Sequence, residues 1–229
     1  MKLPAPAVDY RKFRPHMLRQ PEYSHIPYLL FWPVFGLRYL LLERFLIPEQ
    51  YQEVSCALDA LIPFHEGFLI PYVLWYIFII GIHVYTFLYD VPSFRQYSRF
   101  MITAFSLSTL TFILFPTCQN LRPAVFPRDN FLTDLVKLLY TLDTNTNVCP
   151  SEHVIGSIAA FLAVRRTKSL RKFTAFFGVI AFFTSIATVF LKQHSCVDVL
   201  AALAVCGITY LICFGSRQKI FRRFRRPAV

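Results

Sequence analysis

Six apolar runs, separated by short polar segments, limit what this chain can fold into. They lie at about Tyr28–Ile47, Phe68–Tyr89, Ser98–Phe115, His153–Val164, Phe173–Leu191 and Val197–Phe214. Most are close to the ~20 residues that a helix needs to cross the hydrocarbon core of a bilayer. Because 55% of the 229 residues are hydrophobic, and 25 Phe and 12 Tyr suit lipid-facing and interfacial positions, we expect an all-α fold. We expect this fold to be a polytopic membrane bundle of six transmembrane helices.

The charge pattern orients this bundle. The net charge of +11 could suggest a nucleic-acid partner, but the basic residues stand in short clusters that alternate with acidic loops across all six runs. Positive clusters face the cytoplasm in membrane proteins. We therefore expect a multi-pass protein of the cell membrane with both termini cytoplasmic and no nucleic-acid partner. The loop Thr117–Glu152 and the turn Lys192–Cys196 then lie on the outer face.

The chain divides into three parts on this interpretation. Residues 1–26 form a cytoplasmic tail, residues 27–214 the membrane domain, and residues 215–229 a basic cytoplasmic tail. The N-terminus is polar and Pro-rich, so we expect no cleavable signal peptide. On the outer face, Asp129–Asp143 has the apolar spacing of an amphipathic interfacial helix. Val54–His65 is expected to be a second interfacial or re-entrant segment.

The six cysteines show no zinc-finger spacing and no CxxC pair. Cys206 and Cys213 lie in an apolar run, where cysteine behaves as a small hydrophobic residue. Cys118 and Cys149 fall in the same outer loop, so the sequence allows a disulfide between them.

Three polar clusters fall on the outer face. "CQNLRP" (118–123) ends the third run, "CPSEHV" (149–154) begins the fourth, and "LKQHSCVD" (191–198) joins the fifth to the sixth. Ionisable groups at membrane depth are costly and are functional candidates by default. The side chains that meet at this depth are Arg122, Ser151, His153, Lys192, His194 and Asp198.

Each of these residues has a structural explanation when taken alone. An Arg at a helix end anchors in headgroups, Ser151 could cap a helix, and His194 with Asp198 could be a satisfied i, i+4 pair. Together they suit phosphoryl transfer without a metal or another cofactor. Arg and Lys bind phosphate oxygens, a carboxylate-oriented His can attack phosphorus, and a second His can protonate the leaving oxygen.

The pattern "RP", "PSEH" and "H-x3-D" resembles the type-2 phosphatidic acid phosphatase superfamily, whose motifs run K-x6-RP, PSGH and SR-x5-H-x3-D. The resemblance covers about residues 115–198. It implies that His194 is the nucleophile, Asp198 its orienting acid and His153 the general acid. It also implies that Arg122 and Ser151 hold the phosphate of a membrane lipid, which is the expected substrate.

The sequence departs from these motifs at three positions. The first Lys falls at Phe115, the Gly of PSGH is Glu152, and the Arg of the third motif falls at Thr188. We expect Lys192 to replace one of the missing cations. The variant pattern is similar to the branch near inositol-phosphorylceramide synthases, whose members move a phospho-headgroup onto an alcohol. The motifs do not distinguish that transfer from hydrolysis.

Two outer acids, Asp59 and Glu66, could bind hydroxyls or an amine of a lipid headgroup, and they are equally well explained as solvated loop acids. Arg38 lies inside the first apolar run, and the sequence offers no explanation for it.

Two other functions remain open at this point. His153, His194 and Asp198 could ligate zinc, although Arg122 and Lys192 would repel a cation. A non-enzymatic scaffold or small transporter would instead use its polar groups to line a path through the membrane.

Overall fold

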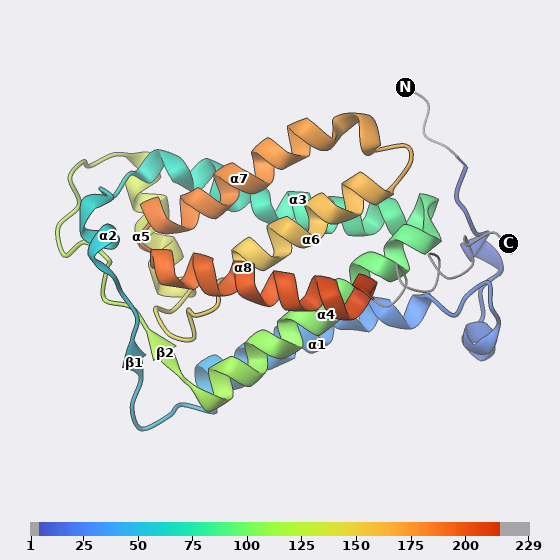
Figure 1. Cartoon of the computed structure of the whole chain (residues 1–229), viewed down its shortest axis with the longest axis horizontal. Helices are drawn as coiled ribbons and strands as arrows, with labels where there is room; N and C mark the ends of the chain where they lie inside the picture. The colour runs from blue at the N-terminus through green and yellow to red at the C-terminus, as the bar shows by residue number, and fades with distance from the viewer. Residues whose placement is uncertain (1–4, 216–229) are drawn as a thin grey trace, which may run out of the picture.

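Six long helices lie alongside one another in the computed structural model, which describes residues 5–215 (Figure 1). They are α1 (Phe31–Arg44), α3 (Leu69–Tyr89), α4 (Val91–Leu114), α6 (Glu152–Arg166), α7 (Thr174–Phe190) and α8 (Cys196–Tyr210). One end of this bundle carries α2 (Ala57–Leu61), α5 (Phe131–Leu142) and two parallel strands, β1 (Gln52–Glu53) and β2 (Thr117–Cys118). Short 3₁₀ segments occupy Tyr10–Lys12, Pro15–Arg19, Ile26–Leu30, Glu66–Phe68 and Arg171–Phe173, and a π-helical turn, Leu211–Gly215, follows α8.

Among residues 5–215, five helical stretches are long and apolar enough to cross a membrane. They are Ile26–Arg44, Glu66–Tyr89, Val91–Leu114, Arg171–Phe190 and Cys196–Gly215. The protein is thus a helical membrane protein by its architecture, but the expected count of six spans is not confirmed. The fourth expected span is α6, whose 15 residues extend only ~22 Å at ~1.5 Å per residue. It ends in two arginines, which lower its mean hydropathy.

The short helix α6 occupies the centre of the bundle. It packs against α3, α4, α7 and α8, and eight of its residues are buried, among them Gly156, Ser157, Ala159 and Ala160. Small residues let helices approach closely. At Gly156 the approach is tightest, because a Cβ built there would lie 2.7 Å from Cζ2 of Trp75 on α3. A helix enclosed by others does not need a lipid-facing apolar surface, which explains its modest hydropathy.

Two helix boundaries show how local capping shapes the fold. The third expected span began at Ser98, but α4 begins at Val91 because the Asp90 side chain accepts a hydrogen bond from Ser93 N (3.0 Å). The amphipathic pattern at 129–143 forms α5, which is capped by Asn130. The segment Val54–His65 contains only the short helix α2.

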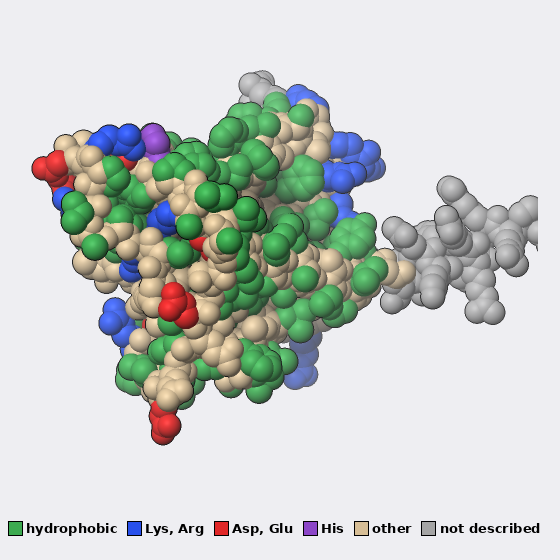
Figure 2. All heavy atoms as spheres, turned by 60° about the vertical axis from the view of Figure 1, so that its left-hand side comes forward, with side chains coloured by type: hydrophobic (Ala, Val, Ile, Leu, Met, Phe, Trp, Pro, Cys, Tyr) green, Lys and Arg blue, Asp and Glu red, His purple; other side chains and the backbone are tan. Residues whose placement is uncertain are grey.

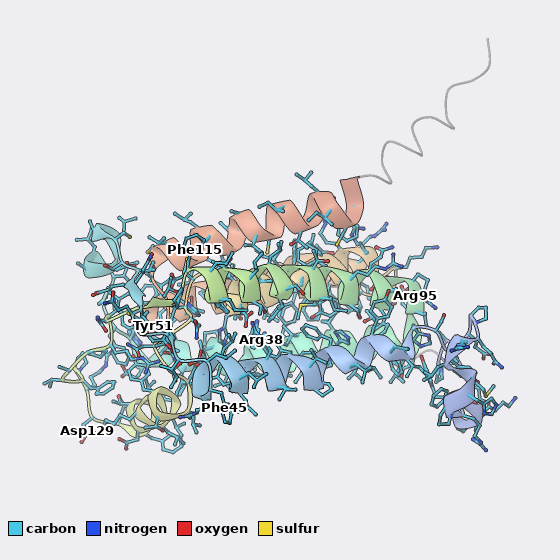
Figure 3. The ribbon with its side chains drawn as sticks, turned by 90° about the horizontal axis from the view of Figure 1, so that it is seen from below. Arg38, Phe45, Tyr51, Arg95, Phe115 and Asp129 are labelled. Carbon is cyan, nitrogen blue, oxygen red and sulfur yellow. The ribbon has the colours of Figure 1, made fainter. Side chains whose placement is uncertain are left out.

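Charged side chains gather at the two ends of the molecule. Figure 2 shows hydrophobic side chains covering its middle. Arg95 lies at one end of the bundle and Asp129 at the other (Figure 3). Apart from Gly215, the expected basic C-terminal tail lies outside the described residues.

Candidate active site

A cavity of about 510 Å³ lies at the end of the bundle that carries α5. Its walls come from α1, α3, Phe112 of α4, α5, the start of α6, the loop 143–148 and the turn that carries Gln193 and His194. His153 and His194 both line it. The cavity therefore joins two of the three motif clusters that the sequence places far apart.

The carboxylate of Asp198 orients the His194 ring. Its Nδ1 lies 3.2 Å from Oδ2 of Asp198, whose side chain is fully buried. The same oxygen accepts a hydrogen bond from Ser195 N (2.9 Å). Ser195 in turn caps α8 through Val197 N and Asp198 N, so the start of the helix fixes the carboxylate. A carboxylate at Nδ1 favours the tautomer with Nδ1–H, which leaves Nε2 free to react.

His153 stands opposite His194 in an aromatic setting. Its ring lies 4.4 Å from the ring of Tyr72 and 4.3 Å from that of Trp75, measured between centroids. The centroids of the two histidine rings are 5.9 Å apart. Nε2 of His153 is buried and has no hydrogen-bond partner within residues 5–215. A buried nitrogen without a hydrogen-bond partner costs free energy, unless a ligand supplies the partner.

Backbone hydrogen bonds bring the three clusters together. Ser151 N donates to Asp198 O (3.1 Å), which joins the start of α6 to α8. Asn147 N donates to Thr117 O (2.6 Å), and Cys149 N donates to the Thr117 hydroxyl (3.1 Å), which joins the same loop to β2. The loop before α6 is therefore held on both sides.

Arg122 lies behind the cavity wall. Its guanidinium donates to the carbonyl oxygens of Tyr140, Asp143 and Thr144 and to Oε1 of Gln193, at 2.6–3.1 Å. Burial lowers the pKa of this guanidinium from its usual value, partly offset by the charge of Asp143. Arg122 is not among the cavity-lining residues, and it reaches the cavity through Gln193.

Ser151 and Lys192 also lie outside the cavity lining. Ser151 is fully buried, and its hydroxyl has no partner among the described residues. Lys192 adopts a left-handed backbone conformation (φ 53°). Its ammonium turns away to the carbonyl oxygens of Asp59 (2.8 Å) and Ile62 (2.5 Å). The structure thus brings the two histidines and Asp198 together. The three expected phosphate-binding residues, Arg122, Ser151 and Lys192, lie outside the cavity lining.

The two expected headgroup acids face other partners. The carboxylate of Asp59 accepts hydrogen bonds from Cys56 N and Cys196 N, both at 2.8 Å. Burial alone would raise the pKa of Asp59, but these hydrogen bonds outweigh it and lower the pKa. Glu66 is paired with Arg128 and accepts from Asn130. Neither acid is among the cavity-lining residues.

The cation that does line the cavity is Arg38. Of the lysines and arginines in residues 5–215, it alone does so. It extends from α1 into the bundle (Figure 3) and donates to Glu152 at 2.7 and 2.6 Å and to Thr109 on α4 at 3.1 Å. Glu152 replaces the motif glycine, so two unexplained sequence features are partners. The signal in the sequence was their joint occurrence, an arginine inside one run and an acid where another begins.

Two further acids line the cavity. Glu43 at the end of α1 accepts hydrogen bonds from Thr144, Thr146 and Asn147. Asp143 accepts from the hydroxyls of Tyr39 (3.3 Å) and Tyr72 (3.1 Å). Burial raises the pKa of Asp143, and the nearby His194 opposes the rise.

The cysteines of the loop between α4 and α6 are free thiols. Cys118 and Cys149 are not bonded to each other. Burial, reinforced by the charge of Asp198, raises the pKa of Cys149 to about 12. Cys149 therefore lies near Asp198, and it is not among the cavity-lining residues.

The region that contains the two histidines is similar to a known protein family. The model described as the PAP2 superfamily matches residues 96–222, more than half of the chain. No curated protein and no solved structure matches the chain. The match covers every motif cluster and α6–α8, and it leaves out α1 with Arg38. Members of this superfamily are generally phosphatases, including lipid phosphoesterases, and the histidines described above lie within the matched region. By this match the chain belongs to the PAP2 superfamily.

Proposed function

We propose that this protein is an integral membrane phosphatase of the phosphatidic acid phosphatase type. It cleaves a phosphomonoester or pyrophosphate of a lipid at the outer face of the cell membrane, with both termini cytoplasmic. The observation that carries the proposal is the pair of histidine rings 5.9 Å apart in one cavity, one of them backed by a buried aspartate. A phosphoryl group between two such rings could contact both.

The proposed reaction has two steps. In the first, Nε2 of His194 attacks phosphorus, the bond from phosphorus to the lipid oxygen breaks, and His153 gives that oxygen a proton. In the second, His153 takes a proton from water as the water oxygen attacks phosphorus, and the N–P bond breaks. Asp198 stabilises the charge on His194 as the N–P bond forms. Phosphate leaves, and both histidines return to their first state.

Arg38 is proposed to bind the phosphate oxygens. Two cations of the family motifs are missing, and Arg122 and Lys192 donate to carbonyl oxygens outside the cavity lining. Arg38 lines the cavity with both histidines. Its terminal nitrogens donate to Glu152 and Thr109. Its Nε is buried and has no partner among residues 5–215, so the guanidinium keeps a donor for a phosphate oxygen. Arg122 is proposed to act as a positioning residue, through Gln193.

The cavity rim supports entry of a lipid from the side. α1 is packed loosely, with only Phe31 and Leu42 buried. Apolar residues of α1, α3 and α5 line the same cavity as the histidines, among them Phe35, Leu42, Tyr76, Leu139 and Leu142. An acyl chain can occupy such a wall while the headgroup reaches the histidines.

A second candidate is transfer of a phospho-headgroup to an alcohol. The observation that favours it is the number of polar groups beyond those that a phosphate needs. Glu43, Asp143 and Asn147 also line the cavity, and carboxylates accept hydrogen bonds from hydroxyls. In that reaction the lipid alcohol leaves in the first step, and His194 holds phosphorus that still carries the headgroup. The bound alcohol would then replace water in the second step, as its oxygen attacks phosphorus and the N–P bond breaks.

The test uses the purified full chain with a panel of lipid phosphates, with and without alcohol acceptors. We expect inorganic phosphate from at least one lipid, inhibition by vanadate, and no effect of a chelator. A new lipid product that depends on the alcohol would favour transfer. If a chelator abolishes the activity, the zinc interpretation is right and the phosphohistidine mechanism is wrong. If no lipid phosphate is consumed, the non-enzymatic alternative is favoured.

A further inference from the structure

A pair of thiols lies in the joint between α2 and the start of α8. Cys56 immediately precedes α2, and Cys196 is the first residue of α8, two positions after His194. Their sulfur atoms and a carboxylate oxygen of Asp59 all lie within 4.8 Å of one another. This cluster lies outside the cavity of the histidines, and nothing described so far uses it.

Asp59 holds the two cysteines together. One of its oxygens accepts from Cys56 N and the other from Cys196 N, each at 2.8 Å. One carboxylate therefore fixes both backbones, and the sulfur atoms need move only ~3 Å or less to reach the ~2.05 Å of a disulfide bond. Both side chains are partly exposed, so a small reagent can reach them.

The same joint carries hydrogen bonds that hold α2 against the histidine turn. Lys192 donates to the carbonyl oxygens of Asp59 and Ile62, and His65 N donates to Phe190 O (3.1 Å). A covalent bond between Cys56 and Cys196 would reinforce a contact that is already formed.

We propose that Cys56 and Cys196 are a redox-active pair that forms a disulfide and locks α2 to the first residue of α8. Two S–H bonds break and one S–S bond forms. The two electrons reduce an external low-molecular-weight disulfide to two thiols, which take up the two protons. The resulting loop of more than a hundred residues restricts the unfolded chain strongly.

Metal binding fits this cluster less well. Within residues 5–215 the group offers three donors, one fewer than a structural zinc site takes. Both oxygens of Asp59 already accept hydrogen bonds, and the charge of the Lys192 ammonium interacts with both Asp59 and Cys196. The Lys192 ammonium would therefore repel a metal cation bound at this cluster.

The test treats the purified full chain with oxidised glutathione or with dithiothreitol, and then counts thiols with a maleimide under denaturing conditions. The chain has six cysteines, and we expect two to be lost on oxidation and regained on reduction. Peptide mapping of the wild-type protein should place the bond between residues 56 and 196. The midpoint of thermal unfolding should rise by about 4 °C or more on oxidation.

Two variants serve as controls. The double variant C118S/C149S, which removes the other outer-loop thiols, should still lose two thiols, whereas Cys56→Ser should lose none and show no rise in midpoint. Six thiols after oxidation, a glutathione adduct without a disulfide, or a bond between other cysteines would overturn the proposal. About one zinc per chain, absent from Cys56→Ser, would also overturn it in favour of a metal site. None of these readouts depends on the catalytic activity, so the result stands apart from the proposed function.

Discussion

Arg38 on α1 and Glu152 at the start of α6 are joined by two hydrogen bonds, at 2.7 and 2.6 Å. Each side chain is only 15% exposed, so each charge is largely removed from solvent and is compensated by its partner. Removing one partner of a buried ion pair costs roughly 3–5 kcal/mol, because the remaining charge is left uncompensated. The pair therefore links a loosely packed helix to the cavity wall that carries His153.

Arg38→Met should lower both the thermal midpoint and kcat/KM. The double variant R38M/E152Q should recover much of the stability, because no buried charge is left unpaired. If Arg38 binds phosphate oxygens, the double variant should still lose about 10²–10³-fold in kcat/KM. A double variant that regains wild-type kcat/KM would show that Arg38 serves only as the counter-ion of Glu152.

Gly156→Ala should impair catalysis although the glycine lies outside the cavity lining. The new methyl would meet the indole of Trp75 at 2.7 Å, and this indole packs on His153. Because small displacements of a catalytic group are costly, we expect kcat to fall at least about tenfold. Gly207→Ala is the control, since a Cβ there has nothing within 4 Å. Equal kcat for the two variants would contradict the coupling from Trp75 to His153.

Much of this architecture could be predicted from the sequence, because apolar runs and charge clusters are local patterns that can be read within a few tens of residues. The amphipathic period at 129–143 is an example, and α5 forms there. The start of α4 could not be placed, since Ser93–Tyr97 is polar enough to suggest a loop and the cap at Asp90 decides the boundary. The fourth expected span corresponds to α6, and its 15 residues leave its role as a span unconfirmed.

The motif histidines could be predicted, whereas the surroundings of the basic residues could not. Arg38 and Glu152 are 114 residues apart, and no local pattern links them. From the sequence we expect Lys192 to replace a missing cation of the motifs, but its backbone is left-handed and its ammonium donates to the carbonyl oxygens of Asp59 and Ile62. Loop conformation, not residue type, decides which cation reaches a cavity.

Arg122→Lys should act on stability more than on phosphate binding. A lysine cannot replace four hydrogen bonds to three carbonyl oxygens and Gln193, so the thermal midpoint should fall. The inhibition constant for vanadate should change less than about threefold, because Arg122 does not line the cavity. A loss of tenfold or more in vanadate affinity would instead support the direct phosphate contact that the family motif implies.

Asp143→Asn should change how stability depends on pH. Burial raises the pKa of Asp143 above its unfolded value. The folded state then holds its proton more tightly than the unfolded state, so the stabilisation is complete below the unfolded pKa of about 4. It is lost as pH rises through the folded pKa. Thermal midpoints should be measured from about pH 3.5 to 8. As pH rises above about 4, the midpoint of Asp143→Asn should increase relative to that of the wild type.

Asp134→Asn on α5, where the side chain is exposed, is the control for removing one carboxylate from the same end of the bundle. A difference between Asp143→Asn and the wild type that stays constant with pH would contradict the raised pKa.

The division of labour between the histidines can be tested with two substrates. If His153 protonates the leaving oxygen, a nitrophenyl phosphate needs this proton less than a lipid phosphate does. His153→Ala should therefore lose about 10²–10⁴-fold on the lipid and much less on the nitrophenyl ester. Asp198→Asn should impair both substrates alike, because it disorients the nucleophile and not the leaving group.

The intermediate provides the second measurement. His194→Ala should form no acid-labile phosphoprotein, because the attacking nitrogen is missing. His153→Ala should accumulate phosphate on residue 194, since water must still be activated in the second step. Equal losses on both substrates for His153→Ala, or acid-labile phosphate in His194→Ala, would reverse or reject the proposed roles.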